Sequence, residues 1–162
     1  MIKSTGIMLF AAAFGISAYA AEIPTMKDGK LKLEAEKGKI SGPMKVKDDK
    51  AASAGKAVVS AKGGALEYEF MVDEAGEYVI WGRVIGPDGT KDSFFVSINS
   101  GPKLIWDIGN KKYGWRQMKG RKKPSKHKLQ KGKNTLKLSY REPEAVIDEI
   151  FIAKPGVKPP KK

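Results

Sequence analysis

The chain has 162 residues, with 31 Lys and Arg, 18 Asp and Glu, one His, no Cys and a formal net charge of +13. This length suits one domain with a single core. Without cysteine there can be no disulfide and no cysteine nucleophile, and a single histidine excludes zinc sites built from His and Cys. The positive charge indicates an anionic partner or surface, although a lysine-rich surface that only keeps a protein soluble gives the same count.

The first twenty residues have the pattern of a secretory signal peptide. Lys3 supplies the charged start, residues 6–17 the apolar segment, and Ala18-Tyr19-Ala20 the small residues of a cleavage site. The apolar run is shorter than the ~20 residues of a spanning helix, which favours cleavage after Ala20 over a membrane anchor. We therefore expect a secreted or periplasmic protein that continues with a polar linker over residues 21–30.

The rest of the chain predicts short strands separated by turns. Apolar and polar residues alternate in several segments, and Gly, Pro and Asp clusters recur every eight to twelve residues, as in β-sandwiches. No segment keeps a helical period over three turns. The strands are expected at 31–36, 56–60, 66–72, 75–85, 93–99, 103–106, 115–118, 127–129, 134–140 and 146–152. We predict an all-β sandwich or jelly roll over residues 31–153, followed by a Lys/Pro-rich, disordered tail at 154–162.

The strand expected at 75–85 carries Trp81 and Arg83 on one face. An arginine is costly to bury without a partner. Arg83 is therefore expected to line a groove or to meet an acid, and a structural ion pair with Asp92 is one form that this contact could take.

Several motifs in this order resemble one known group of proteins. They are Glu34-Ala35-Glu36, Ala75-Gly-Glu-Tyr78 before Trp81-Gly-Arg83-Val84, Phe-Val-Ser-Ile-Asn at 95–99, Trp115 ahead of 129–135, and the last strand at 146–152. The pattern resembles the carbohydrate-binding modules of families 6 and 35, which are galactose-binding-domain-like β-sandwiches. The resemblance covers residues 31–153 and implies a non-catalytic carbohydrate-binding protein.

The same resemblance implies a structural calcium ion. In those families the opening Glu-x-Glu and an acid on the last strand hold the metal, which points to Glu34, Glu36 and Asp148 in this chain. Residues i and i+2 of a strand share a face, and carboxylate oxygens are hard ligands suited to calcium. The alternative is that these acids face solvent and pair with Lys32 or Lys37.

The resemblance also places a sugar site in loops at one end of the sandwich, where aromatic rings stack on pyranose faces. Trp115 is the first choice for such a platform and Trp106 the second, with Tyr113 near them, while Trp81, Arg83 and Asp92 would form the groove floor. Packing in the core or in a loop is the alternative for each ring. Many relatives carry an Asn just before the last-strand acid, whereas this chain has Ala145, Val146 and Ile147 there.

The segment from Ile108 to Arg141 contains thirteen Lys and Arg and no acid. Arg116, Lys122 and Lys123 belong to it, and Tyr113 and Trp115 lie within it. Such a block repels itself unless an anion meets it. A basic rim with aromatic rings suits a uronate or sulfated glycan, and it also suits single-stranded nucleic acid.

The sequence thus predicts an exported, non-catalytic protein that binds carbohydrate, of the acidic kind, and carries a structural calcium ion. It contains no Gly-x-Ser-x-Gly elbow and no phosphate-binding loop. Three alternatives stay open: a nucleic-acid or lipopolysaccharide binder that uses residues 111–133, a structural or adaptor domain without a ligand, and a small hydrolase or lyase whose paired carboxylates meet only in the folded chain.

Overall fold

The computed structural model describes residues 22–121 and 125–161. The predicted signal peptide therefore lies outside the described residues, as do Lys122 and Lys123. No helix in the described part of the chain is long and apolar enough to cross a membrane.

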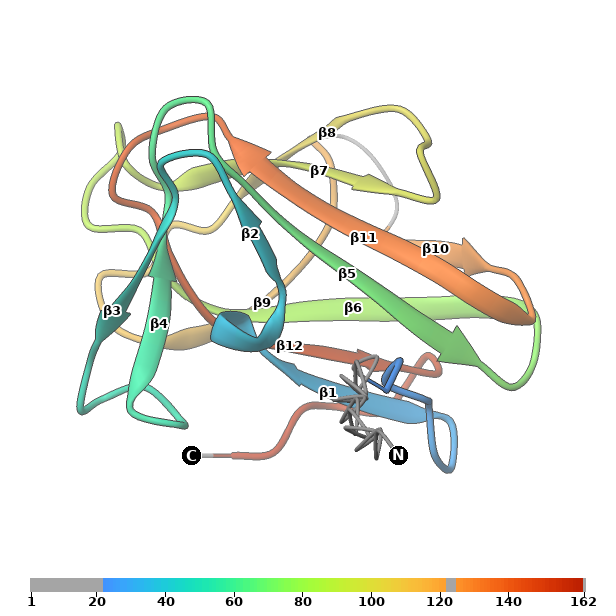
Figure 1. Ribbon diagram of the computed structural model, residues 1–162. Helices are drawn as coiled ribbons and strands as arrows, with labels where there is room; N and C mark the ends of the chain where they lie inside the picture. The colour runs from blue at the N-terminus through green and yellow to red at the C-terminus, as the bar shows by residue number, and fades with distance from the viewer. Residues whose placement is uncertain (1–21, 122–124, 162) are drawn as a thin grey trace, which may run out of the picture.

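Two antiparallel sheets pack face to face (Figure 1). The first has seven strands in the order β10-β6-β12-β4-β3, with β1 also paired to β12 and β9 also paired to β6. The second has five strands in the order β2-β5-β11-β7-β8. The strands are β1 (Lys30–Glu34), β2 (Lys39–Ser41), β3 (Lys45–Asp48), β4 (Lys56–Val59), β5 (Ala65–Val72), β6 (Gly76–Ile85), β7 (Ser93–Ile98), β8 (Leu104–Asp107), β9 (Gly114–Gln117), β10 (Lys126–Leu129), β11 (Gly132–Tyr140) and β12 (Val146–Ala153). The predicted all-β sandwich is confirmed.

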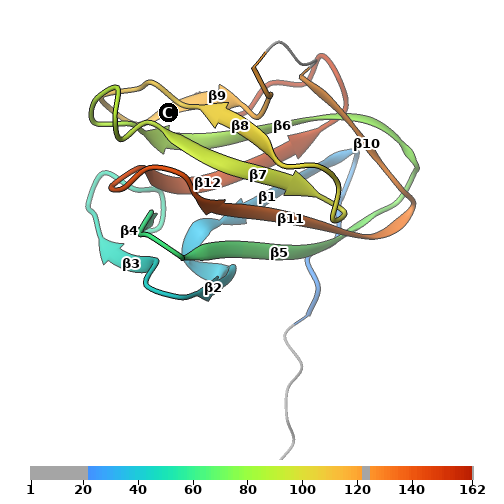
Figure 2. The ribbon, with the colours of Figure 1, turned by 90° about the horizontal axis from the view of Figure 1, so that it is seen from above.

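The core lies between the sheets. In the view from above, β7, β11 and β5 of one sheet overlie β6, β12 and β1 of the other (Figure 2). Alternation along each strand sends apolar side chains inward, as with Leu31 and Leu33 of β1 and Leu136 and Leu138 of β11. β12 is the exception, because all eight of its residues are buried. This strand has neighbours on both edges and is covered on both faces, which explains its nearly continuous apolar sequence.

The first strand is shorter than predicted. β1 ends at Glu34, and Ala35–Lys37 forms a single 3₁₀ turn. Gly38 follows this turn and packs so close to the core that a Cβ there would lie 2.5 Å from Leu66 Cδ1. Glu34 and Glu36 are therefore not alternate residues of one strand, and the expectation that they share a strand face is wrong.

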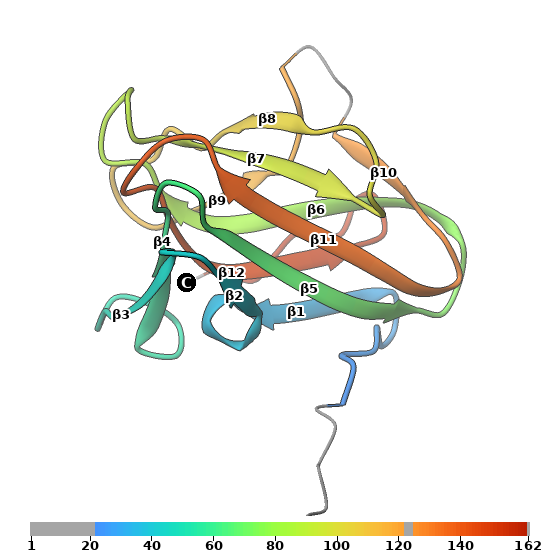
Figure 3. The same cartoon turned by 45° about the horizontal axis from the view of Figure 1, so that its top comes forward.

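The segment at 39–48, where no strand is expected from the sequence, contains the short strands β2 and β3. They sit at the edges of the two sheets (Figure 3). The β3–β4 hairpin and the loop between β8 and β9 flank the end of β6, and this end of the sandwich holds the candidate site.

Candidate functional site

A cavity of about 380 Å³ opens at the Ile85 end of β6. Three segments far apart in the sequence line it: the turn between β3 and β4, the end of β6, and the loop between β8 and β9. The lining residues are Asp49, Ala51, Arg83, Ile85, Lys111, Lys112 and Tyr113. We call this cavity the Arg83–Tyr113 pocket.

Arg83 is fixed in place by three contacts of its guanidinium group. One nitrogen, Nη1, forms an ion pair with Asp148 Oδ2, and Nη2 donates to the carbonyl of Ala51 at 3.2 Å. The guanidinium carbon lies 4.5 Å from the centre of the Tyr113 ring, a cation–π contact. The arginine therefore enters the pocket in one orientation and needs little reorganisation to meet a ligand.

Asp148 is completely buried and lies where β12 slips in register against β6, between Ile147 and Glu149. A bulge of this kind turns a side chain out of the regular alternation. The second carboxylate oxygen of Asp148 accepts hydrogen bonds from the backbone N–H of Ser53 at 2.9 Å and from its hydroxyl at 3.0 Å. The predicted groove-lining arginine thus has an acid partner, but this partner is Asp148 and not Asp92.

Tyr113 is held by Asp49 as well as by Arg83. Its hydroxyl donates to Asp49 Oδ2 at 2.8 Å, and this bond is the main reason that the pKa of Asp49 lies below its usual value. Burial raises the pKa of Tyr113, and the neighbouring Asp49 raises it further. The hydroxyl therefore stays protonated near neutral pH, and Asp49 stays ionised.

Lys111 and Lys112 complete the rim and are exposed. Within the described residues neither has an ion-pair partner. Other cations of the basic segment are paired with acids from neighbouring strands: Arg121 with Asp107, Lys126 with Glu77, Lys133 with Glu69, Lys137 with Glu67 and Arg141 with Glu142. The folded chain thus neutralises much of a block that looks uniformly positive in the sequence.

The structure overturns the choice of Trp106 as a platform. Its side chain is only 1% exposed, its ring stacks on Phe94 with the centroids 6.0 Å apart, and its Nε1 donates to Gln117 O at 2.8 Å. Gly82 lies against this ring, since a Cβ at Gly82 would be 2.4 Å from Trp106 Cη2. Trp106 is therefore a core residue that cannot present a face to a ligand.

The remaining predicted site residues lie apart from the pocket lining. Trp115 is directly opposite Arg83 on β9, but its Nε1 donates to Pro160 O at 3.2 Å, while Trp81 is half-buried on β6. Arg116 Nε donates to Ile108 O at 3.0 Å and to Asn110 Oδ1 at 2.8 Å, so it fastens the β8–β9 loop. Asp92 lies near Glu142, and burial raises its pKa.

In the structure, the three predicted calcium ligands Glu34, Glu36 and Asp148 do not form one metal-binding group. In the part of the chain that the structure describes, no three His, Cys, Asp or Glu side chains converge to hold a metal ion. Glu34 and Asp148 both contact the hydroxyl of Ser53, whereas Glu36 keeps one buried oxygen without a hydrogen-bond partner. The positive Arg83 already occupies one oxygen of Asp148. Calcium at Glu34, Glu36 and Asp148 stays a prediction from the resemblance.

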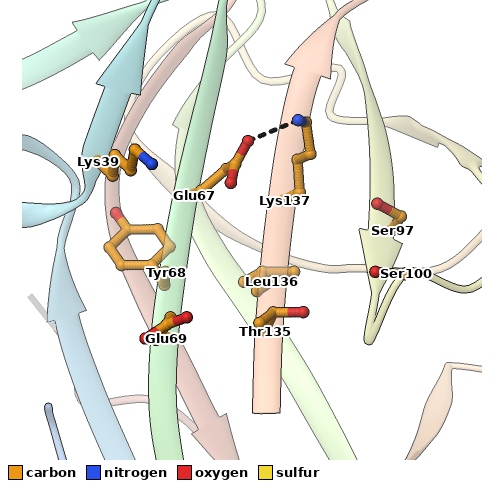
Figure 4. Close-up of a pocket in the computed structure, with 9 residues that line it drawn as sticks. All are labelled: Lys39, Glu67, Tyr68, Glu69, Ser97, Ser100, Thr135, Leu136 and Lys137. Atoms are coloured by element: carbon orange, nitrogen blue, oxygen red, sulfur yellow. Dashed lines mark hydrogen bonds and ion pairs between the residues drawn. The ribbon is translucent and has the colours of Figure 1, made fainter.

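A second hollow, of about 550 Å³, lies over the outer face of the five-stranded sheet (Figure 4). Lys39, Glu67, Glu69 and Lys137 project into it, and an ion pair of 2.5 Å joins Glu67 to Lys137. Its lining contains one aromatic side chain, Tyr68, which is 6% exposed. The lining of this hollow consequently offers no open ring for stacking, unlike that of the Arg83–Tyr113 pocket.

Sequence reasoning missed half of the pocket. Asp49, Ala51 and Ser53 come from residues 37–55, where the sequence predicts mostly loop, and only the folded chain brings them to β6 and β12. The one sequence feature that could have pointed to this part of the pocket is the pair of acids Asp48-Asp49 in a polar turn.

Comparison with known proteins agrees with this architecture. Residues 35–160 match the family model described as the glycosyl hydrolase family 115 C-terminal domain. A search of curated proteins gave no match. The fold is similar to a family 35 carbohydrate-binding module from Clostridium thermocellum, with 22% identity and a TM-score of 0.63, covering 75% of this chain and 97% of that module.

Two further solved structures share the fold. One is an exo-β-1,3-galactanase from Phanerochaete chrysosporium, with 21% identity, a TM-score of 0.65 and 76% of this chain covered, although the match spans only 29% of the galactanase. The other is the C-terminal family 6 module of a laminarinase from Zobellia galactanivorans, with 19% identity, a TM-score of 0.59, and coverage of 77% of this chain and 99% of that module. The predicted resemblance is confirmed, and the chain belongs to the glycosyl hydrolase family 115 C-terminal domain family.

Proposed function

We propose that this domain binds an acidic polysaccharide through the Arg83–Tyr113 pocket and does not itself cleave it. The observation that carries the proposal is a cavity rimmed by Lys111 and Lys112, which have no ion-pair partner among the described residues, and containing the Tyr113 ring. Arg83 lies beside this ring and is paired with Asp148. Guanidinium and ammonium groups pair with carboxylates or sulfates, and aromatic rings supply the apolar contact that a sugar ring needs.

The comparisons support a carbohydrate partner without naming a sugar. The family to which the chain belongs takes its name from a glycosyl hydrolase, and similar folds occur as carbohydrate-binding modules. We infer that the domain acts beside a glycoside hydrolase catalytic unit, in the exported setting that residues 1–20 predict, and holds the substrate near that unit. The chain spans only 29% of the length of the similar galactanase. The link between this domain and the activity of a whole enzyme is therefore part of the proposal.

A binding titration with charge-reversal variants tests the proposal. Lys111→Glu and Lys112→Glu are measured singly against one control reversal and then together. We expect a uronate-bearing polysaccharide to bind the parent protein, and Lys111→Glu combined with Lys112→Glu to weaken binding at least about tenfold, or ~1.4 kcal/mol. Lys128→Glu is the control, because Lys128 lies opposite Glu77 at the other end of β6 and is also exposed. Tyr113→Ala should weaken binding as well, whereas Tyr113→Phe keeps the ring and should retain more of the affinity.

The competing function is a general polyanion binder that uses the whole basic segment. The ion pairs of Lys126, Lys133 and Lys137 with acids of neighbouring strands count against it, since they lower the net charge of that face. Salt decides between the two, because the Debye length falls from ~10 Å at 0.1 M to about 3 Å at 1 M. If DNA, heparin and uronate polymers bind equally and dissociate at the same salt concentration, and Lys128→Glu weakens binding as much as the pocket variants do, the pocket proposal is wrong.

No binding to any glycan would instead favour a structural or adaptor domain. Lys122 and Lys123, which the sequence placed among the binding residues, lie outside the described residues and stay a prediction. Changing both to Glu in the same titration shows whether they extend the rim.

A further inference from the structure

Three aromatic side chains lie on neighbouring strands of the seven-stranded sheet and point away from the core. Arg83 is paired with Trp115 across β6 and β9, and Trp81 is paired with Phe151 across β6 and β12. Trp115 and Phe151 meet edge to face, with their centroids 6.3 Å apart. We call these rings, with Trp81 between them in strand order, the outer aromatic face.

The outer aromatic face is partly covered, although it lies on the side of the sheet that faces away from the core. Phe151 is only 6% exposed, and Trp81 and Trp115 are half-buried. Phe151 is absent from the group of buried residues that pack between the sheets. Other parts of the chain must therefore shield the outer aromatic face from water.

The C-terminal segment provides part of this cover. After β12 the chain makes a turn over Lys154–Val157, in which the Val157 N–H donates to Lys154 O at 3.2 Å and Gly156 has φ +94. Proline and then glycine at the two central positions, with a positive φ at the glycine, are the signature of a type II turn. This turn reverses the chain, so that the remaining residues run back below β12 and β1 toward the C terminus (Figure 1).

The returning segment meets Trp115 at its prolines. Pro159 is half-buried, and Pro160 O accepts the hydrogen bond from the Trp115 indole. The C terminus accordingly lies beside β9 in the view from above (Figure 2). The sequence predicted a disordered tail here, whereas the structure places Pro160 in contact with Trp115 of β9.

We propose that the outer aromatic face is a binding surface for a proline-rich segment and that its occupant is this chain's own residues 157–161. Proline has a fixed φ and loses little conformational entropy when it docks. Aromatic surfaces bind proline-rich segments for this reason, and an indole N–H can donate to the free carbonyl of such a segment. The structure contains both features: an aromatic surface and a hydrogen bond from a tryptophan indole to a proline carbonyl.

Covalent linkage makes weak docking sufficient. A short linker gives the tail an effective concentration in the millimolar range, so even a peptide affinity of that order would keep the surface occupied. Because Trp115 lies opposite Arg83, the docked tail also limits access to the sheet surface next to the Arg83–Tyr113 pocket. The docking itself is independent of carbohydrate binding.

The indole N–H resonances of the three tryptophans test this proposal directly, with Trp115→Phe assigning one of them. We expect a chain that ends at Val157 to shift the Trp115 resonance and leave that of the core residue Trp106 in place. The synthetic peptide Val-Lys-Pro-Pro-Lys-Lys, added to the shortened protein, should restore the original position. The full chain should not respond to the peptide because its surface is filled.

Two full-length variants separate the prolines from the charges. Pro159→Ala with Pro160→Ala should loosen the tail and move the Trp115 resonance in the direction of the shortened chain. Lys158→Ala with Lys161→Ala, the matched control, should leave it unchanged. An unchanged Trp115 resonance in the shortened chain would overturn the proposal. Shifts in the full chain that depend on protein concentration would also overturn it, since they would assign the occupant to a second copy.

Discussion

Arg83 on β6 and Asp148 on β12 form an ion pair that joins the candidate pocket to the buried strand behind it. The Asp148 side chain is completely buried, and that of Arg83 is only 12% exposed. The same guanidinium group contacts Tyr113, so the geometry of the pocket depends on a charge that lies under it. Both the stability of the fold and the shape of the pocket therefore depend on this one ion pair.

Arg83→Ala should strongly destabilise the protein, because it leaves the Asp148 carboxylate buried without its cation. Breaking a buried ion pair from one side costs about 3–5 kcal/mol. Urea unfolding of the parent and of the variant measures this difference.

The double variant Arg83→Ala with Asp148→Asn is the control for that experiment. It removes both charges, so we expect it to recover part of the lost stability. A loss below about 1 kcal/mol in the single variant would show that Asp148 does not depend on Arg83.

The same variant tests calcium binding. The resemblance predicts calcium at Asp148, but in the parent protein Arg83 already supplies the positive charge there. A calcium ion would have to displace Arg83, so we expect the parent's melting temperature in calcium to be only slightly higher than in EDTA. Arg83→Ala leaves Asp148 near Glu34, with Ser53 between them, and without its cation. Calcium should then stabilise the variant by mass action on the folded state and raise its melting temperature.

The control for calcium is Glu36→Gln in the Arg83→Ala background, which should lose part of the response if Glu36 moves in as a ligand. A clear rise in the melting temperature of the parent protein with calcium would show that the ion displaces Arg83. Such a result would support the metal site that the family resemblance implies.

The fold could be predicted because its signals are local. Alternation in β5 and β11, and turn residues between strands, indicate a sandwich before any contact is known. The pairing of charges could not be predicted in this way. Lys137 and Glu67 are neighbours only because β11 and β5 are adjacent, and seventy residues separate them in the chain.

The candidate site was predictable only in part, for the same reason. Arg83 and Tyr113 were identified from residue type and context, and both line the pocket. Trp106 and Trp115 both have a mixture of polar and apolar neighbours in the sequence. What separates them is the space above Gly82, which accepts the Trp106 ring, and this contact between strands of different sheets has no local signature.

The single histidine gives the last prediction, a loss of stability in mild acid. His127 on β10 is buried, and its Nε2–H donates to Met118 O at 2.6 Å, which ties the edge strand to the end of the β9 segment. Burial lowers the pKa of His127, and the hydrogen bond to Met118 offsets part of this effect. The unfolded chain, whose histidine has a pKa near 6.5, therefore binds this proton more readily than the folded chain.

The free energy of unfolding should consequently fall as the pH decreases from about 6.5 toward the lower folded pKa, with a slope of at most ~1.4 kcal/mol per pH unit for one proton. Above that window the contribution is constant. Urea unfolding between pH 7 and pH 5 measures the slope, and His127→Gln, which cannot titrate, is the control that should remove it. Acids with lowered pKa values, such as Asp49 and Asp107, lose their stabilising ionisation only at lower pH. An equal slope in parent and variant between pH 7 and pH 5 would show that His127 does not carry the effect.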